Sequence, residues 1–179
     1  MTEEQSEQDE ARLSKADALT RMVRVSEARD LTGGAPSVVP QDMDLREVGR
    51  QMYGRREVKT VAVVDAEGRL TGIIPLRLLL DELFFRVMPE EFISEVLLPG
   101  RMEEVEKMAR AETAVDLMQP PVYVTLDEMV KDAFSRMHDN ELEGLPIVDE
   151  EMRPVGYLDR FQLLEVWIRE HRPQGSGSP

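Results

Sequence analysis

Apolar and polar residues along this chain follow a pattern that occurs twice. Each copy begins with a short extended segment and continues with an amphipathic helix, two strands joined by a turn, and a second amphipathic helix. The strand pairs are TVAVVD and RLTGII around the turn AEG in the first copy, and LPIVD and PVGYL around EEMR in the second. Branched apolar runs on both sides of turn residues are typical of β-hairpins.

The first helix of each copy shows apolar residues at spacings of three and four. These are Leu45, Val48 and Met52 in the first copy, and Val130, Ala133, Phe134 and Met137 in the second. We therefore expect each stripe to face a core. Thr125 and Glu128 form a T-x-x-E pattern, which predicts a capping box at the start of the second copy's helix. The closing helices are PLRLLLDELFFRV and DRFQLLEVWIRE, and the extended segments are 37–39 and 122–124.

The two copies align over residues 29–83 and 115–167, where Gly72 corresponds to Gly156. One copy is too short to bury both faces of its sheet alone, so we expect the two sheets to pack on each other and share a core. The predicted fold is α+β, with two pseudo-twofold-related strand-helix-strand-strand-helix halves and a helical insertion between them.

The pattern divides the chain into five segments. They are a disordered acidic tail with an N-terminal helix (1–27), a first repeat (28–88), a helical linker (89–112), a second repeat (113–170) and a flexible tail (171–179). Apolar spacing between Glu10 and Arg29 indicates the N-terminal helix, which GGAP at 33–36 should end. Pro89 with two following glutamates favours a helix start in the linker.

Composition excludes several classes of protein. The 36 acidic and 22 basic residues leave a formal charge of −14, which argues against a general nucleic-acid binder and against binding to anionic membranes. The most apolar stretch is interrupted by charges and predicts no membrane span, and the polar N-terminus is no signal peptide. The chain has no cysteine, so disulfides and thiolate zinc sites are excluded. We expect a cytoplasmic protein.

Catalytic and metal-binding patterns are missing from the sequence. His138 and His171 are isolated, which disfavours a zinc site. No phosphate-binding glycine loop, nucleophile elbow or paired acid and base can be identified. We therefore expect a protein that is not an enzyme and requires no metal or cofactor.

The duplicated unit resembles the CBS domain, which usually occurs as a tandem pair called a Bateman module. The matching stretches are DLMQPPVYVTLDEMVKDAFSRM and GLPIVDEEMRPVGYLDRFQLL, with VKTVAVVDAEGRLTGIIPLRLLL as a weaker first copy. The resemblance implies a regulatory module that binds adenine nucleotides or S-adenosylmethionine between its halves. It also implies a homodimer shaped as a flat disc.

In ligand-binding relatives the last strand ends in Gly and two apolar residues. A Thr or Ser follows, whose hydroxyl meets phosphate, and an Asp three residues later accepts hydrogen bonds from ribose. In the first copy these two polar positions are occupied by Pro75 and Leu78, so both polar groups are missing. In the second copy, after Gly156 and Tyr157, they are occupied by Asp159 and Gln162. The second copy is therefore the better-preserved cleft.

Asp159 and Gln162 allow two compatible interpretations. A carboxylate at 159 would repel phosphate, whereas the Gln162 amide can bond a ribose hydroxyl, so an uncharged nucleoside or a cationic ligand fits better than ATP. Alternatively, D-x-x-Q is a capping box for the closing helix.

Other residues belong to the cleft edges by family pattern. They are Tyr123, Val124, Thr125, Leu145 and Pro146 in the second copy, and Val38, Val39, Pro40, Val61 and Ala62 in the first. The alternative is that Thr125 caps a helix and the others lie in the core. The basic cluster Arg55, Arg56 and Lys59 either meets a phosphate or is solvated.

Two functions remain open. The first is a sensor of an adenosine-type ligand, namely AMP, ADP, ATP or S-adenosylmethionine. The second is a dimeric scaffold with degenerate clefts that binds an unknown protein partner, for which the N-terminal helix and the insertion would supply the contact surface.

Overall fold

The chain forms two similar halves, each with a three-stranded sheet and helices. A computed structural model describes residues 23–87 and 111–170. The elements in chain order are α2 (Val25–Thr32), β1 (Val38–Pro40), α3 (Leu45–Gly54), β2 (Thr60–Val64), β3 (Leu70–Pro75), α4 (Leu76–Val87), α7 (Ala114–Leu117), β4 (Val124–Thr125), α8 (Val130–Asp139), β5 (Gly144–Val148), β6 (Pro154–Asp159) and α9 (Arg160–Glu170).

The two sheets have the same topology. Their strand orders are β1-β2-β3 and β4-β5-β6, with the first pair parallel and the second pair antiparallel in each sheet. Strands β2 and β5 are buried along their whole length and contact each other across the two sheets. The predicted α+β fold with two repeated halves is therefore confirmed, including the packing of sheet on sheet.

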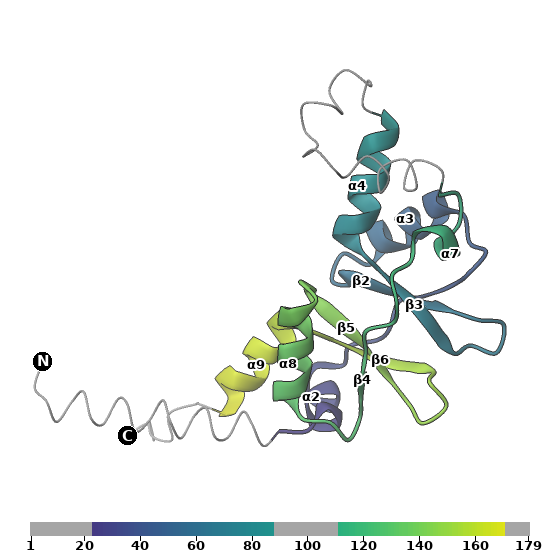
Figure 1. Cartoon of the computed structure of the whole chain (residues 1–179). Helices are drawn as coiled ribbons and strands as arrows, with labels where there is room; N and C mark the ends of the chain where they lie inside the picture. The colour runs from purple at the N-terminus through teal and green to yellow at the C-terminus, as the bar shows by residue number, and fades with distance from the viewer. Residues whose placement is uncertain (1–22, 88–110, 171–179) are drawn as a thin grey trace, which may run out of the picture.

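The leading helix of each half packs on the other half. In Figure 1, α2 from the start of the chain lies with α8 and α9, and α7 lies beside α3 and β3. The backbone records this exchange: Val25 N donates to Glu128 O at 2.9 Å, and Val130 N donates to Val23 O at 2.9 Å. At the corresponding place in the first half, Leu45 N donates to Glu112 O at 3.0 Å. The segment that comes before the first half therefore packs on the second half, and the segment that comes before the second half packs on the first.

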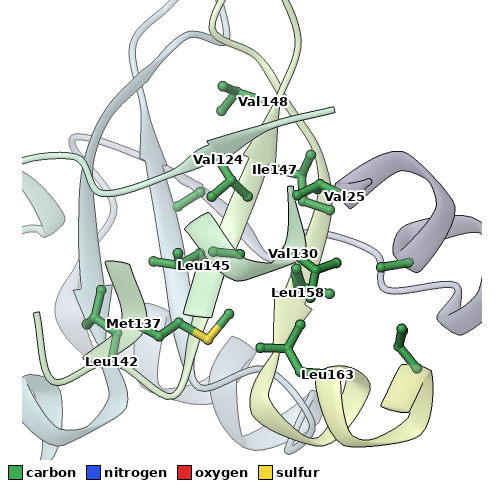
Figure 2. Close-up of a cluster of buried hydrophobic side chains, with 14 of the residues drawn as sticks. Val25, Val124, Val130, Met137, Leu142, Leu145, Ile147, Val148, Leu158 and Leu163 are labelled. Carbon is green, nitrogen blue, oxygen red and sulfur yellow. The ribbon is translucent and has the colours of Figure 1, made fainter. Parts of the chain in front are cut away.

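Both cores contain residues from these exchanged segments. The core of the second half includes Val25 and Ala28 of α2, and Figure 2 shows Val25 beside Ile147, Leu158 and their neighbours. The core of the first half includes Ala114 and Leu117 of α7. Because every one of these four exchanged side chains is at most 5 % exposed, each half loses core surface when its partner segment is absent.

Three local expectations were wrong. Phe134 does not face the core but is 53 % exposed, because the buried face of α8 is narrower than the apolar stripe. Thr125 does not cap α8, which begins five residues later at Val130, where Asp132 accepts a hydrogen bond from Met129 N. Pro75 is the last residue of strand β3, paired with Thr60, and is not in the first turn of a helix.

Helix α2 ends where GGAP predicts, with Gly33 as its C-cap in the left-handed conformation. Its start differs from the expected helix, since Arg24 is extended and the helix begins at Val25. The expectations for 10–22 and for helices within 89–110 lie outside the described residues. Among the described helices, none is long and apolar enough to span a membrane.

Truncating Val25 tests the exchange of leading helices. Val25 is fully buried within the core of the second half, so Val25→Ala should lower the free energy of unfolding by about 2 kcal/mol. Urea unfolding measures the loss, and Glu27→Ala, at an exposed position of the same helix, is the matched control and should change little. Equal stability of Val25→Ala and the control would contradict the exchanged packing.

Candidate ligand-binding cleft

The turn between β6 and α9 holds the two polar residues that the family pattern places in the cleft. Asp159 Oδ1 accepts a hydrogen bond from Gln162 N at 2.7 Å, and Gln162 Oε1 accepts one from Asp159 N at 2.8 Å. This reciprocal arrangement is the capping box that D-x-x-Q predicts. It leaves the Gln162 side-chain Nε2 without a hydrogen-bond partner among the described residues.

The loop before β1 closes one side of this turn. Tyr157 N donates to the carbonyl oxygen of Gly34 at 3.0 Å, so the loop of the first half extends the edge of β6. A Cβ atom on residue 34 would lie 2.3 Å from the Tyr157 carbonyl oxygen and 2.5 Å from Gln162 Nε2. Glycine is therefore required for this close approach, and the approach brings the first half against Gln162.

Tyr157 joins the two halves below the turn. Its side chain is only 3 % exposed, and its hydroxyl accepts a hydrogen bond from Lys59 N at 2.9 Å. The ring has room because Gly144 lacks a side chain, since a Cβ there would lie 2.2 Å from the Tyr157 hydroxyl oxygen. Burial raises the pKa of this hydroxyl to about 12, so Tyr157 remains a neutral, structural hydrogen-bond partner at physiological pH.

Neighbouring groups act on the pKa of the Asp159 carboxyl group in both directions. The pKa of Asp159 is raised above its ordinary value, chiefly because the carboxyl group is partly buried, and the negative charge of Glu143 acts in the same direction. Backbone N–H groups of Gln162 and Phe161 and the positive charge of Lys59 oppose this shift. Lys59 therefore partly compensates the carboxylate, which the sequence interpretation did not include.

The predicted edge residues are distributed over both halves. Val39, Val61, Ala62, Val124, Leu145, Pro146 and Tyr157 are buried, Val38, Thr125, Asp159 and Gln162 are half-buried, and Pro40 is exposed. Tyr157, Asp159 and Gln162 lie together, but their polar neighbours across the cleft are Gly34 and Lys59 of the first half. The contacts around Asp159 and Gln162 therefore join the turn between β6 and α9 to segments of the first half that precede β1 and β2.

The corresponding turn of the first half has lost its polar groups. Ile73 and Gln119 exchange two backbone hydrogen bonds of 3.1 and 2.9 Å, which matches the Tyr157–Gly34 contact. Pro75 and Leu78 are both buried. A cavity of about 320 Å³ opens beside this turn and is lined by Lys59, Pro75, Leu76, Arg77, Leu80, Asp81, Glu141, Leu142 and Glu143. Neither of the two positions that are polar in the family pattern carries a polar side chain here.

Thr125 belongs to a different hollow, at the edge of β4. This cavity of about 550 Å³ is lined by Pro121, Val122, Tyr123, Thr125, Glu128, Arg136 and Asn140. Arg136 pairs with the Glu128 carboxylate and also donates to the Tyr123 carbonyl oxygen. Burial would raise the pKa of Glu128, but hydrogen bonds from Arg136 and Thr125 lower it overall. The charges in this hollow are therefore satisfied internally.

The sequence indicates a break after the N-terminal helix at GGAP but does not indicate that Gly34 contacts Tyr157 and Gln162. Gly34 lies 85 residues before Gln119, so the two residues occupy equivalent positions of the two repeats. Only the structure shows that each of them pairs with the edge strand of the other half. No group of three or more His, Asp or Glu residues within 23–87 and 111–170 is arranged to hold a metal ion.

Comparisons with known proteins agree with this architecture. The family model "CBS domain" matches residues 28–84 and 114–169. A CBS domain-containing protein of Thermotoga maritima, solved as a crystal structure, is 27% identical, with a TM-score of 0.67 over 85% of this chain and 98% of its own.

Two further similar structures contain ligands. CBSX2, in complex with AMP, is 19% identical, with a TM-score of 0.60 over 84% of this chain and 99% of its own. The CBS domain pair of protein MJ0100, in complex with 5′-methylthioadenosine and S-adenosyl-L-methionine, is 17% identical, with a TM-score of 0.58 over 80% of this chain and 96% of its own.

Replacing the Asp159 carboxyl group tests the electrostatics of the turn. A raised pKa means that the folded state binds the proton more readily than the unfolded state, so this group's stabilising contribution is lost as pH rises through its folded-state pKa. Asparagine caps helices as well as aspartate, so Asp159→Asn should gain stability relative to the wild type between pH 4 and pH 7. Urea midpoints across that range measure the gain, and a pH-independent difference between the two proteins would contradict it.

Proposed function

We propose that this chain, which belongs to the CBS domain family, is a non-catalytic regulatory module that binds an adenosine-type ligand in the cleft beside Asp159 and Gln162. The observation that carries the proposal is the hydrogen bonding of the Gln162 side-chain amide. Its Oε1 caps α9, whereas its Nε2 has no hydrogen-bond partner among the described residues and lies against the Gly34 loop. A side-chain amide held in this way can donate to a ribose hydroxyl without releasing the helix cap.

The charges of the cleft favour particular adenosine derivatives. Asp159 stands where the family pattern has a hydroxyl for phosphate, and a like charge about 4 Å away costs about 1 kcal/mol in water and more when buried. Lys59 compensates part of this charge, but its Nζ already donates to the Arg56 carbonyl oxygen. We therefore propose an uncharged nucleoside or a cationic ligand such as S-adenosylmethionine ahead of AMP, ADP or ATP. The complexes of MJ0100 and CBSX2 support an adenosyl ligand in general.

The first cleft favours a second function for that half of the molecule. Pro75 and Leu78 replace both polar groups, and Pro75 has no N–H to donate. If the second cleft were also empty of ligand in the cell, the chain would act as a dimeric scaffold that binds a protein partner. In this alternative the fold and the dimer are the same, but no nucleoside binds to the protein or stabilises it.

We further propose a homodimer formed through the helices. Equivalent positions of α4 and α9 carry exposed apolar side chains in both halves: Leu80 and Leu164 are 54 % and 49 % exposed, and Phe84 and Ile168 are 52 % and 51 % exposed. Exposed apolar residues gathered in this way mark protein–protein contacts more often than free surface. The internal pseudo-twofold would present both helices to a second copy together.

Ligand binding should be visible as thermal stabilisation. Adenosine or S-adenosylmethionine at 100 times its dissociation constant should add about 2.7 kcal/mol to the free energy of unfolding, with a weaker effect of ATP. Gln162→Ala should weaken the ligand that binds by about tenfold, because one hydrogen bond to ribose is lost. Thermal shift and calorimetric titration measure both effects.

Asp132→Ala is the matched control, since Asp132 caps α8 in the same way but lies outside the cleft. It should lose comparable stability and keep its affinity. No stabilisation by any adenosyl ligand at millimolar concentration would reject the sensor and leave the scaffold.

The proposed dimer should depend on the exposed leucines. Leu164→Glu should shift light scattering at micromolar concentration towards monomer, because a charge would be buried in an apolar interface. Leu31→Glu, at a 42 % exposed position of α2, is the control and should leave the mass unchanged. A wild-type protein that scatters as a monomer would reject the dimer.

A further inference from the structure

An apolar groove runs between helices α3 and α4, which lie side by side in the first half (Figure 1). Its volume is about 320 Å³. On each helix the apolar lining residues recur at spacings of three and four, so they share one face of that helix. They are Gly49, Met52 and Tyr53 on α3, and Leu76, Leu79, Leu80 and Leu83 on α4. The stripe on α4 is about 10 Å long at the rise per residue of an α-helix.

The groove is open because residue 49 is glycine. A Cβ atom on residue 49 would meet only Leu79 Cδ2, at 4.0 Å. The buried residues of α3 and α8 coincide when the two ten-residue helices are aligned from their first residues. The same alignment places Phe134 of α8 at the position of Gly49. The second half therefore carries an aromatic ring where the first half has space.

Two cations lie at one end of the groove, where α3 ends and α4 begins. They are Arg56 and Lys59, and the Lys59 carbonyl oxygen accepts a hydrogen bond from Leu76 N, in the first residue of α4, at 2.8 Å. Within 23–87 and 111–170, neither side chain forms an ion pair, and none of the residues that line the groove is acidic. The first turn of α4 adds the partial positive charge of a helix N-terminus. This end of the groove therefore attracts an anion.

The two cations are positioned to share one anionic group. The Arg56 guanidinium lies over the Tyr53 ring, 4.6 Å from its centroid, which holds it at the rim of the groove. Lys59 Nζ donates to the Arg56 carbonyl oxygen and retains two further protons to donate. A carboxylate suits this pair, because a planar guanidinium donates two parallel hydrogen bonds to its two oxygens.

The rest of the groove favours an apolar chain. Tyr53 and Leu80 are 72 % and 54 % exposed, so a chain lying between them would remove apolar surface from water. The volume is at the lower end of the range found for small-molecule sites, and such sites are mostly apolar with a few polar groups. Together with the short apolar stripe, this volume matches a medium-chain acyl group better than a long lipid chain.

We infer that the groove between α3 and α4 binds a free medium-chain carboxylate, with its acyl chain over Gly49 and its carboxylate on Arg56 and Lys59. The site lies on the helices of the first half and does not rest on the adenosyl ligand proposed above. The ligand enters from solution, because the formal charge of −14 disfavours an anionic membrane surface as its source. Leu80 also belongs to the surface proposed for the dimer, so ligand binding and dimer mass are measured on the same samples.

Chain length and head-group charge test the ligand class. The wild-type protein is titrated calorimetrically with hexanoate, octanoate and decanoate. Each added pair of methylene groups should tighten binding by about fifteenfold while the added carbons are buried. Octylamine has the same chain as octanoate with the opposite charge, and it should bind weakly or not at all. Absence of binding by every carboxylate would overturn the site, and equal binding of octanoate and octylamine would overturn the role of the cations.

Filling the groove tests its location. Gly49→Phe introduces the residue that the second repeat carries at the equivalent position, and it should abolish the binding of decanoate. Gly54→Phe is the matched control, since Gly54 is an exposed residue of the same helix outside the groove and a Cβ atom there would meet nothing within 4 Å. It should bind decanoate as the wild type does. Thermal unfolding checks that both variants are folded, and full binding by a folded Gly49→Phe protein would overturn the site.

Replacing one cation tests the contact with the carboxylate and leaves the groove open. Arg56→Gln should weaken octanoate by about tenfold, because charge-assisted hydrogen bonds are lost. Arg46→Gln removes the same charge from an exposed position of α3 outside the groove, and it should change the affinity little. Equal losses in the two variants would reduce the effect to net charge and overturn the direct contact.

Other occupants of the groove would give different results. If a second copy of the chain fills it, Gly49→Phe would convert a dimer to a monomer in light scattering while no carboxylate binds to the wild type. If a membrane lipid fills it, the wild type would co-sediment with vesicles of phosphatidylglycerol and phosphatidylcholine and bind no free carboxylate. Either result would overturn the inference.

Discussion

The architecture depends on backbone pairing between each sheet and a loop from the opposite half. In the second half, the edge of β6 is covered by Gly34, which accepts the hydrogen bond of Tyr157 N; in the first, the edge of β3 is covered by Gln119, which exchanges two hydrogen bonds with Ile73. These contacts cover strand edges that would otherwise expose unpaired N–H and C=O groups. They also hold α2, which comes before the first half in sequence, on the second half, and α7, which comes before the second half, on the first. The two repeats therefore form one folded unit with a continuous set of buried contacts.

The same pairing brings the two halves together at the turns that precede α4 and α9. Each turn lies against a segment of the other repeat, so the polar groups available there come from both repeats. In the second half, Asp159, Gln162 and the neighbouring Lys59 keep polar groups at the turn, with Gly34 close enough to contact Gln162. In the first half, Pro75 and Leu78 are buried as ordinary strand and core residues. A duplicated fold can differ at these turns without losing stability, because helix capping and core packing stabilise each half on their own.

Asymmetry also extends to the outer surface. The buried positions of α3 and α8 coincide, because both helices pack against equivalent sheets. Their exposed positions are free of that constraint and differ in size and charge, as Gly49 and Phe134 show. In a symmetric pair of repeats, such differences at equivalent positions distinguish one half from the other for any partner that approaches the helices.

The sequence by itself determined the features that arise from local spacing. Period-two and period-3.6 patterns predicted the strand-helix-strand-strand-helix order of each half, although not the short helix α7. D-x-x-Q predicted the capping box of Asp159 and Gln162, because these interactions join residues within a few positions of each other. Only the tertiary structure decided where α8 begins, since Met129 and Val130 pair with Arg24 and Val23, more than a hundred residues away. It likewise decided that Phe134 is exposed, and that Gly34 and Lys59 meet Tyr157 and Gln162. These outcomes depend on which half each leading segment joins, and local periodicity carries no information about that choice.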